Sequence, residues 1–176
     1  MLTDTLHHHL FAEKDTSAYA VLDGAAVPNL PRMIEEHKPR HACLVRGLEE
    51  NPELIEVSPY FVQLEYGASF TEWVLAKCPG KRWGIFAVIP EQIAFVNVRK
   101  HFRDWLRVSL RGERVFYRYY DPFVFNMFTP HCNQQQLRDF FGPVNRYVLD
   151  KTGDEGTAGL VEYSLDKGTL REQLIP

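Results

Sequence analysis

The sequence predicts an α/β fold, in which a mixed β-sheet is flanked by helices and a small helical or hairpin C-terminal lobe follows. Short apolar runs alternate with amphipathic segments up to about residue 105, and such alternation implies helices packed on a sheet. A hairpin is expected next, because Arg111-Gly112 separates two strand-like stretches. Hydrophobic residues make up 45% of the 176 residues, which suits the packed core of one domain.

Three parts are predicted along the chain. Residues 1–17 are polar and are expected to form a flexible, irregular N-terminal segment, in which His7-His8-His9 belongs to a tail or a short helix. Residues 18–120 form the main α/β lobe. Residues 121–176 form a smaller C-terminal lobe of the same domain, with a closing hairpin.

The predicted strands are short apolar stretches bounded by turn residues. They cover residues 18–22, 42–45, 60–65, 82–89, 106–110, 113–120, 146–149 and 160–165. Residues 49–59 carry two prolines and are expected to be mostly loop, and residues 153–159 a flexible loop.

The predicted helices are amphipathic stretches with start and stop signals. They cover residues 29–38, 69–78, 90–106, a short stretch from residue 121, and residues 134–141. Asn29 is a plausible cap of the first helix, and Ser69 with Glu72 has the spacing of a capping box. The long helix carries an apolar seam at spacings of three and four, formed by Phe95, Val98, Phe102 and Trp105.

Charge and composition exclude several classes of protein. The formal net charge is −3, whereas a general affinity for nucleic acid needs a clear basic excess. No stretch approaches the ~20 apolar residues that span a bilayer, and the first residues lack a signal-peptide pattern. The three cysteines, Cys43, Cys78 and Cys132, are far apart and odd in number, which indicates reduced thiols. We therefore expect a cytoplasmic protein that binds neither nucleic acid nor membrane.

The run from Phe116 to Pro122 is the densest aromatic and charged segment of the chain. Arg118 is expected on an extended segment that is covered on both faces, so its guanidinium needs a partner, and Asp121 is the nearest carboxylate. Asp121 is also placed to cap the following helix. Arg118 therefore either stabilises a local network or forms an anion or partner site.

The predicted long helix carries two further sets of candidates. Arg99, Arg103 and Arg107 recur every four residues, so a continuing helix presents them as one basic row, either a solvated face or a docking strip for an acidic partner. His101 lies on the flank of the apolar seam, where it suits a half-buried histidine bonded to a carbonyl. A catalytic role for His101 needs a nucleophile or carboxylate nearby.

Familiar catalytic patterns are missing from the sequence. It has no Gly-rich phosphate loop, no G-x-S-x-G elbow and no H-E-x-x-H motif, and its histidines and cysteines do not have a standard zinc spacing. We therefore expect a protein that is not an enzyme and that uses no cofactor and no metal.

Seven segments stand in a fixed order along the chain, and they are Tyr19-Ala20-Val21-Leu22-Asp23-Gly24, Pro59-Tyr60-Phe61-Val62-Gln63-Leu64, Phe70-Thr71-Glu72-Trp73-Val74-Leu75, Trp83-Gly84-Ile85-Phe86, Arg99-Lys100-His101-Phe102-Arg103, Phe116-Tyr117-Arg118-Tyr119-Tyr120-Asp121-Pro122 and Phe140-Phe141-Gly142-Pro143. Together they resemble the Tap family of adaptor-chaperones of bacterial type VI secretion, and the resemblance covers about residues 18–148. The resemblance implies a protein that binds a toxic effector in the cytoplasm and helps to load it onto the spike protein of the secretion tube, without catalysis. The chain departs from the family pattern at Phe102 and at Phe123, where arginines are usual.

The resemblance and the residue types together give a hypothesis for the binding region. An amphipathic segment of the effector is expected to dock against the predicted long helix and the hairpin that follows it. This region is rich in aromatic residues and arginine, which are enriched at the energetic centres of interfaces. An alternative is that Phe123, Phe125 and Phe128 only fill the junction with the C-terminal lobe. A competing function is a small enzyme or anion-binding protein with a site around His101, Arg118 and Asp121. The candidate effector-binding residues are Arg99, Arg103, Arg118, Phe123, Phe125 and Phe128.

Overall fold

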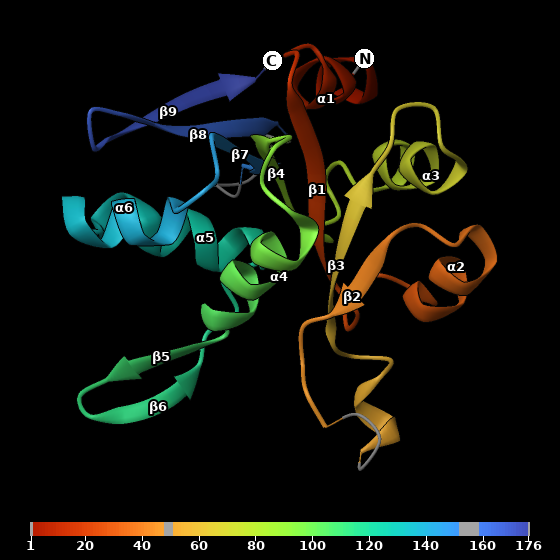
Figure 1. The fold of residues 1–176 in the computed structure, drawn as a ribbon, viewed down its shortest axis with the longest axis horizontal. Helices are drawn as coiled ribbons and strands as arrows, with labels where there is room; N and C mark the ends of the chain where they lie inside the picture. Colours follow the sequence, from red (N-terminus) through yellow and green to blue (C-terminus); the bar gives the residue numbers. More distant parts are fainter. Residues whose placement is uncertain (1, 48–50, 152–158, 176) are drawn as a thin grey trace.

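We describe the fold from a computed structural model, which defines residues 2–47, 51–151 and 159–175. Its centre is a seven-stranded sheet in the order β2-β3-β1-β4-β7-β8-β9, and a separate hairpin is formed by β5 and β6. Figure 1 shows the hairpin projecting away from the sheet, beyond the end of α4. The strands are β1 (Thr16–Asp23), β2 (His41–Cys43), β3 (Pro59–Leu64), β4 (Gly84–Pro90), β5 (Arg107–Leu110), β6 (Glu113–Phe116), β7 (Arg146–Asp150), β8 (Leu160–Asp166) and β9 (Thr169–Ile175).

Helices cover both faces of the sheet, which gives three layers (Figure 1). Alternate strand residues point to opposite faces, so Tyr19 and Val21 join one core cluster while Ala20 and Leu22 join the other. The first cluster contains residues of α4 (Phe95–Asp104), α5 (Pro122–Phe128) and α6 (Gln134–Phe141). The second contains residues of α1 (Leu2–Phe11), α2 (Leu30–His37) and α3 (Ser69–Lys77).

The predicted α/β class is confirmed, but the described strands pair only antiparallel rather than forming a mixed sheet. The connections explain this. β3 and β4 both flank β1, so the connection through α3 joins two strands that have an antiparallel strand between them. The connection through α2 likewise leads from β1 to β2, with β3 between them. These two helical connections therefore join next-nearest strands, whereas the connection through α4, α5 and α6 joins the neighbouring antiparallel strands β4 and β7.

Most predicted elements are present with shifted ends. The helix predicted for residues 90–106 is limited to α4, and the strand predicted for residues 113–120 ends at Phe116. Strand β9 was not predicted. It pairs with β8, whereas the expected closing hairpin is formed by β7 and β8, the strands predicted at 146–149 and 160–165. The flexible loop expected at 153–159 lies outside the described residues except for its last position.

Asn29 occupies the predicted N-cap position of α2, but neither of the two predicted caps makes the expected side-chain hydrogen bond. Asn29 has a left-handed conformation with φ 56° and its side chain makes no capping hydrogen bond. Ser69 is already the first helical residue of α3, so it stands one position too late for the capping box. The capping box that the structure does contain joins Asn133 and Gln136 at the start of α6.

Residues 1–17 are not an irregular segment, because they include α1 and the start of β1. Leu6 and Leu10, one helical turn apart, are 0% and 1% exposed and pack into the second core cluster. His9 bonds Glu162 of β8 at 2.8 Å, and Arg146 of β7 donates to the His9 carbonyl at 2.9 Å. The proposed division into lobes at residue 120 stays a prediction, although β7–β9 extend the same sheet as β1–β4.

None of the helices in the described part of the chain is long and apolar enough to cross a bilayer.

The burial of α1 predicts a large effect of one substitution. Leu6→Ala should lower the free energy of unfolding by about 2–5 kcal/mol, because a buried leucine loses its packing and leaves a cavity. His8→Ala, at an exposed position of the same helix, should change it by less than about 0.5 kcal/mol. Urea unfolding followed by circular dichroism measures both, and equal stability of the two variants would show that α1 is not part of the core.

Candidate functional site: a cationic cleft and the exposed face of α5

An open cleft of about 510 Å³ lies between the segment after β2, the end of α4 and the β5–β6 hairpin. Its apolar lining is Leu44, Val45, Leu106 and Phe116, and its charged lining is Arg46, Arg103, Asp104, Arg107 and Arg114. We call this the cationic cleft.

The hairpin takes its position from main-chain geometry. Arg111 and Gly112 both have positive φ, 51° and 86°, as a two-residue hairpin turn requires. The Tyr117 N–H donates to the Leu106 carbonyl at 2.8 Å, which fixes the base of the hairpin next to the end of α4. Arg107 then lies directly opposite Phe116 across the two strands, and both side chains line the cleft.

Arg103 is the most constrained cation of the cleft. Its Nε donates to the Leu44 carbonyl and its Nη2 to the Cys43 carbonyl, both at 3.2 Å. Burial lowers the pKa of Arg103, and the positive charges of Arg99 and Arg46 lower it further. Asp104, the one carboxylate among the described residues that line the cleft, accepts a hydrogen bond from Lys100 at 2.6 Å.

The predicted row of Arg99, Arg103 and Arg107 is therefore only partly correct. α4 ends at Asp104, and Arg107 belongs to β5 rather than to a continuing helix. The structure still brings Arg103 and Arg107 to the same cleft. Arg46 and Arg114 were missed, and the alternation of Arg114 with Phe116 on one predicted strand was the signal available for the hairpin.

The exposed face of α5 is the second candidate surface. Phe123, Met127 and Phe128 are 46%, 46% and 53% exposed, and their spacing puts them on one side of this short helix. The Arg82 guanidinium stacks over the Phe123 ring with its carbon 5.2 Å from the centroid. Phe128 packs edge-on against Tyr117, with ring centroids 6.3 Å apart.

Phe125, in contrast, belongs to the core. It is 0% exposed, and its ring lies 5.1 Å from Tyr147 and 5.4 Å from both Phe140 and Tyr163, measured between centroids. Its side chain is not accessible to a partner, so the prediction of Phe125 as a binding anchor is replaced by the alternative that it fills the junction with the C-terminal strands.

Arg118 and Asp121 have different partners from those predicted. Arg118 pairs with Asp23 of β1, and its side chain is 48% exposed rather than covered. The reason is that the extended segment ends at Phe116 and the chain turns, with the Asp121 N–H donating to the Arg118 carbonyl at 3.0 Å. Asp121 caps α5 as predicted, accepting from the Phe123 N–H at 2.9 Å, and it pairs with Arg82 at 2.8 Å.

His101 has the predicted half-buried position. Its Nε2 donates to the Phe140 carbonyl at 2.9 Å, and burial lowers the pKa of the ring. The ring packs tightly on Gly142, where an added Cβ atom would lie 2.6 Å from it. His101, Arg118 and Asp121 thus each have their own partner, and the described contacts do not join His101 to the other two.

Comparison with known proteins identifies a family. A family model described as a domain of unknown function, DUF4123, matches residues 18–139, so the chain belongs to this family. The search of curated proteins and the search of solved structures found no match.

The position of the three phenylalanines of α5 predicts different effects on stability. Phe125→Ala should lower the free energy of unfolding by about 3–5 kcal/mol, because it removes a ring from the centre of the core. Phe123→Ala and Phe128→Ala should each cost less than about 1 kcal/mol, because these rings are half exposed. Chemical denaturation measures the three values, and a Phe125→Ala variant as stable as the other two would contradict this placement.

The His101 environment predicts a pH dependence. The folded pKa lies below the ordinary 6.5, so between these values the unfolded chain binds a proton that the folded chain does not. The free energy of unfolding should therefore fall as the pH is lowered through 6.5, down to the folded pKa. His101→Gln keeps a donor for the Phe140 carbonyl but has no titrating group.

Urea unfolding at pH values above and below 6.5 should show a smaller loss of stability on acidification for His101→Gln than for the wild type. His8→Gln, at an exposed position, is the matched control and should follow the wild type. If the free energy of unfolding changed with pH in the same way for His101→Gln and for the wild type, a buried neutral His101 would be excluded.

Proposed function

Taking the family as the starting point, we propose that this protein is a cytoplasmic adaptor that binds a type VI secretion effector and helps to load it onto the spike protein. The observation that carries the proposal is the exposed face of α5, where Phe123, Met127 and Phe128 are each about half exposed. Aromatic residues and methionine are enriched in protein interfaces. The resemblance of the seven segments to the Tap family supplies the identity of the partner.

The arrangement suits binding without rearrangement of the fold. Phe125 is fixed in the core directly beneath the exposed rings, and Asn126 donates to the Asp150 carbonyl at 2.9 Å, so α5 is held rigidly against the sheet. A rigid helix that presents partly buried rings loses little conformational entropy when a partner covers the remainder. An interface of ordinary size buries ~1,600 Å² in total, so α5 would form only its centre.

We also propose that the protein is not an enzyme. The competing hypothesis of a site around His101, Arg118 and Asp121 requires these groups to act together. Arg118 is neutralised by Asp23, Asp121 is engaged by Arg82 and by the α5 cap, and His101 donates to a carbonyl. An anion site at Arg118 would have to compete with the Asp23 carboxylate.

Affinity purification of the tagged protein from its own bacterium, with mass spectrometry, tests the proposal. The wild type should recover one large effector polypeptide at near-stoichiometric level. The double variant Phe123→Ser, Phe128→Ser should recover at least about tenfold less, because hot-spot rings often contribute 2 kcal/mol or more each.

The matched control is Tyr66→Ser, Leu174→Ser, which removes two similarly exposed apolar side chains elsewhere, 77% and 64% exposed. It should recover the effector like the wild type. If the Phe123→Ser, Phe128→Ser variant recovered as much effector as the wild type and kept the same circular dichroism spectrum, this face would be excluded as the binding site. Recovery of no effector by the wild type, with crosslinking included, would exclude the adaptor function.

A further inference from the structure

Among the described residues, the arginines around the cationic cleft form no ion pair with a carboxylate, whereas four arginines elsewhere do. Arg82, Arg118, Arg146 and Arg171 each form an ion pair with an aspartate or glutamate. Within the described ranges, no such pair is formed by the five arginines near the cleft, which are Arg46, Arg99, Arg103, Arg107 and Arg114. The protein has a net charge of −3 overall, so this local excess does not follow from a shortage of acidic residues.

Keeping these charges together is unfavourable for the isolated chain. Arg99 and Arg46 both lower the pKa of Arg103, which is the effect of like charges at short range. Arg99 also has a buried Nε without a hydrogen-bond partner in the described part of the chain. A negatively charged ligand in the cleft would offset the repulsion between these cations.

The geometry of the cleft suits carboxylates. Two main-chain carbonyls hold the Arg103 side chain through Nε and Nη2, so its guanidinium is oriented before any ligand arrives. Guanidinium groups match the planar geometry of carboxylates and bind them with two hydrogen bonds. Arg107 and Arg114 lie on the neighbouring strands of the hairpin and are both exposed, so they are free to bind further acidic groups.

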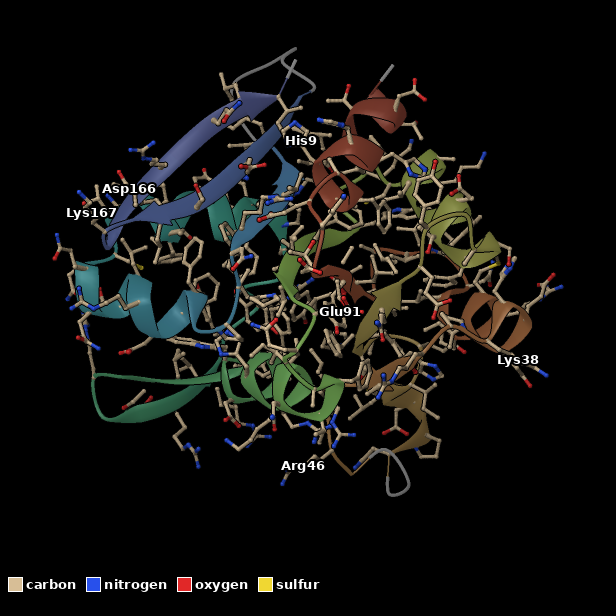
Figure 2. All side chains as sticks on the ribbon, turned by 45° about the horizontal axis from the view of Figure 1, so that its top comes forward. His9, Lys38, Arg46, Glu91, Asp166 and Lys167 are labelled. Carbon is tan, nitrogen blue, oxygen red and sulfur yellow. The ribbon has the colours of Figure 1, made fainter. Side chains whose placement is uncertain are left out.

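The cleft also has an apolar component. Leu44 and Leu106 are buried along it, and Phe116 is 50% exposed at its hairpin side. The volume of about 510 Å³ is enough for a few side chains of a peptide. Figure 2 shows Arg46 near the lower edge of the molecule in this view, and Arg46 lines the open cleft. The cations lie on three separate parts of the fold, which suits carboxylates spread along a segment better than one small anion.

We propose that the cationic cleft binds an acidic segment of the effector polypeptide, with carboxylates on the arginines and an apolar side chain on Phe116. The proposal depends on the proposed function for the identity of the polypeptide, whereas the preference for an acidic segment follows from the cleft itself. The cleft thereby sets which segment of a cargo is recognised, in addition to the apolar contact at α5.

The first test uses a short fluorescein-labelled peptide of glutamates around a central leucine, followed by fluorescence anisotropy on the full-length protein. A peptide with glutamine in place of each glutamate is the neutral control. The acidic peptide should bind, its affinity should fall as salt is raised, and the neutral peptide should not bind. The double variant Arg107→Gln, Arg114→Gln should lower the affinity at least about tenfold.

The matched control is Arg32→Gln, Arg138→Gln, which removes the same charge from two exposed positions on α2 and α6. It should bind the acidic peptide like the wild type. Equal binding by the cleft variant, or no binding by the wild type, would overturn the proposal. Inorganic phosphate is added as a competitor, and displacement of the peptide by phosphate at comparable concentrations would show a small-anion site instead.

The second test repeats the affinity purification with the cleft variant. Reduced effector recovery is expected. Full recovery of the effector by the cleft variant would overturn the proposal while leaving the adaptor function intact. Recovery of no effector by the wild type, together with peptide binding at the cleft, would overturn the adaptor function and leave the preference for an acidic polypeptide standing.

Discussion

The pairing of β4 with β7 at the centre of the sheet determines how the rest of the chain is arranged. Residues 85–88 pair with residues 146–149, although about 60 residues lie between them along the chain. The chain between these strands must therefore leave the sheet and return beside its starting point. It crosses one face as α4, α5 and α6. On the other side of β4, Gly84 allows close approach to β1, since a Cβ atom there would lie 2.1 Å from the Val21 carbonyl oxygen. The exposed face of α5 and the part of the cleft formed by α4 and the β5–β6 hairpin consequently lie on this one segment between β4 and β7, while the segment after β2 completes the cleft.

The same constraint explains why a helix as short as α5 is stable. A seven-residue helix has little stability of its own, so it depends on tertiary contacts. Asp121 caps its start, Phe125 anchors it in the aromatic cluster, and Asn126 accepts a hydrogen bond from the Tyr163 hydroxyl at 2.9 Å. With the inner side fixed in this way, Phe123 and Phe128 are not needed for the fold. Their exposure is therefore available for contact with another molecule.

The sequence predicted the parts of the fold that depend on local pattern. The hairpin tip at Arg111-Gly112, the Asp121 cap and the flank position of His101 all follow from neighbouring residues, and all three are present. The partner of Arg118 was not predictable, because Asp23 lies 95 residues away in sequence. The burial of Phe125 was not predictable either, because every position of α5 except Asn126 is apolar and the sequence of the helix therefore does not distinguish a buried side from an exposed one.

Two features of the surface are unfavourable for the isolated protein, and both lie on the segment between β4 and β7 or beside it. The exposed rings of α5 leave apolar area in water, and the cleft holds several arginines that form no ion pair among the described residues. The same chain pairs Arg82, Arg118 and Arg146 and buries most of its other rings, so the fold is able to satisfy such groups. Exposed rings and unpaired charges that the rest of the fold avoids tend to concentrate at functional sites. A partner that offers apolar side chains to α5 and carboxylates to the cleft would compensate both costs, which is why a polypeptide ligand explains this surface better than a small molecule.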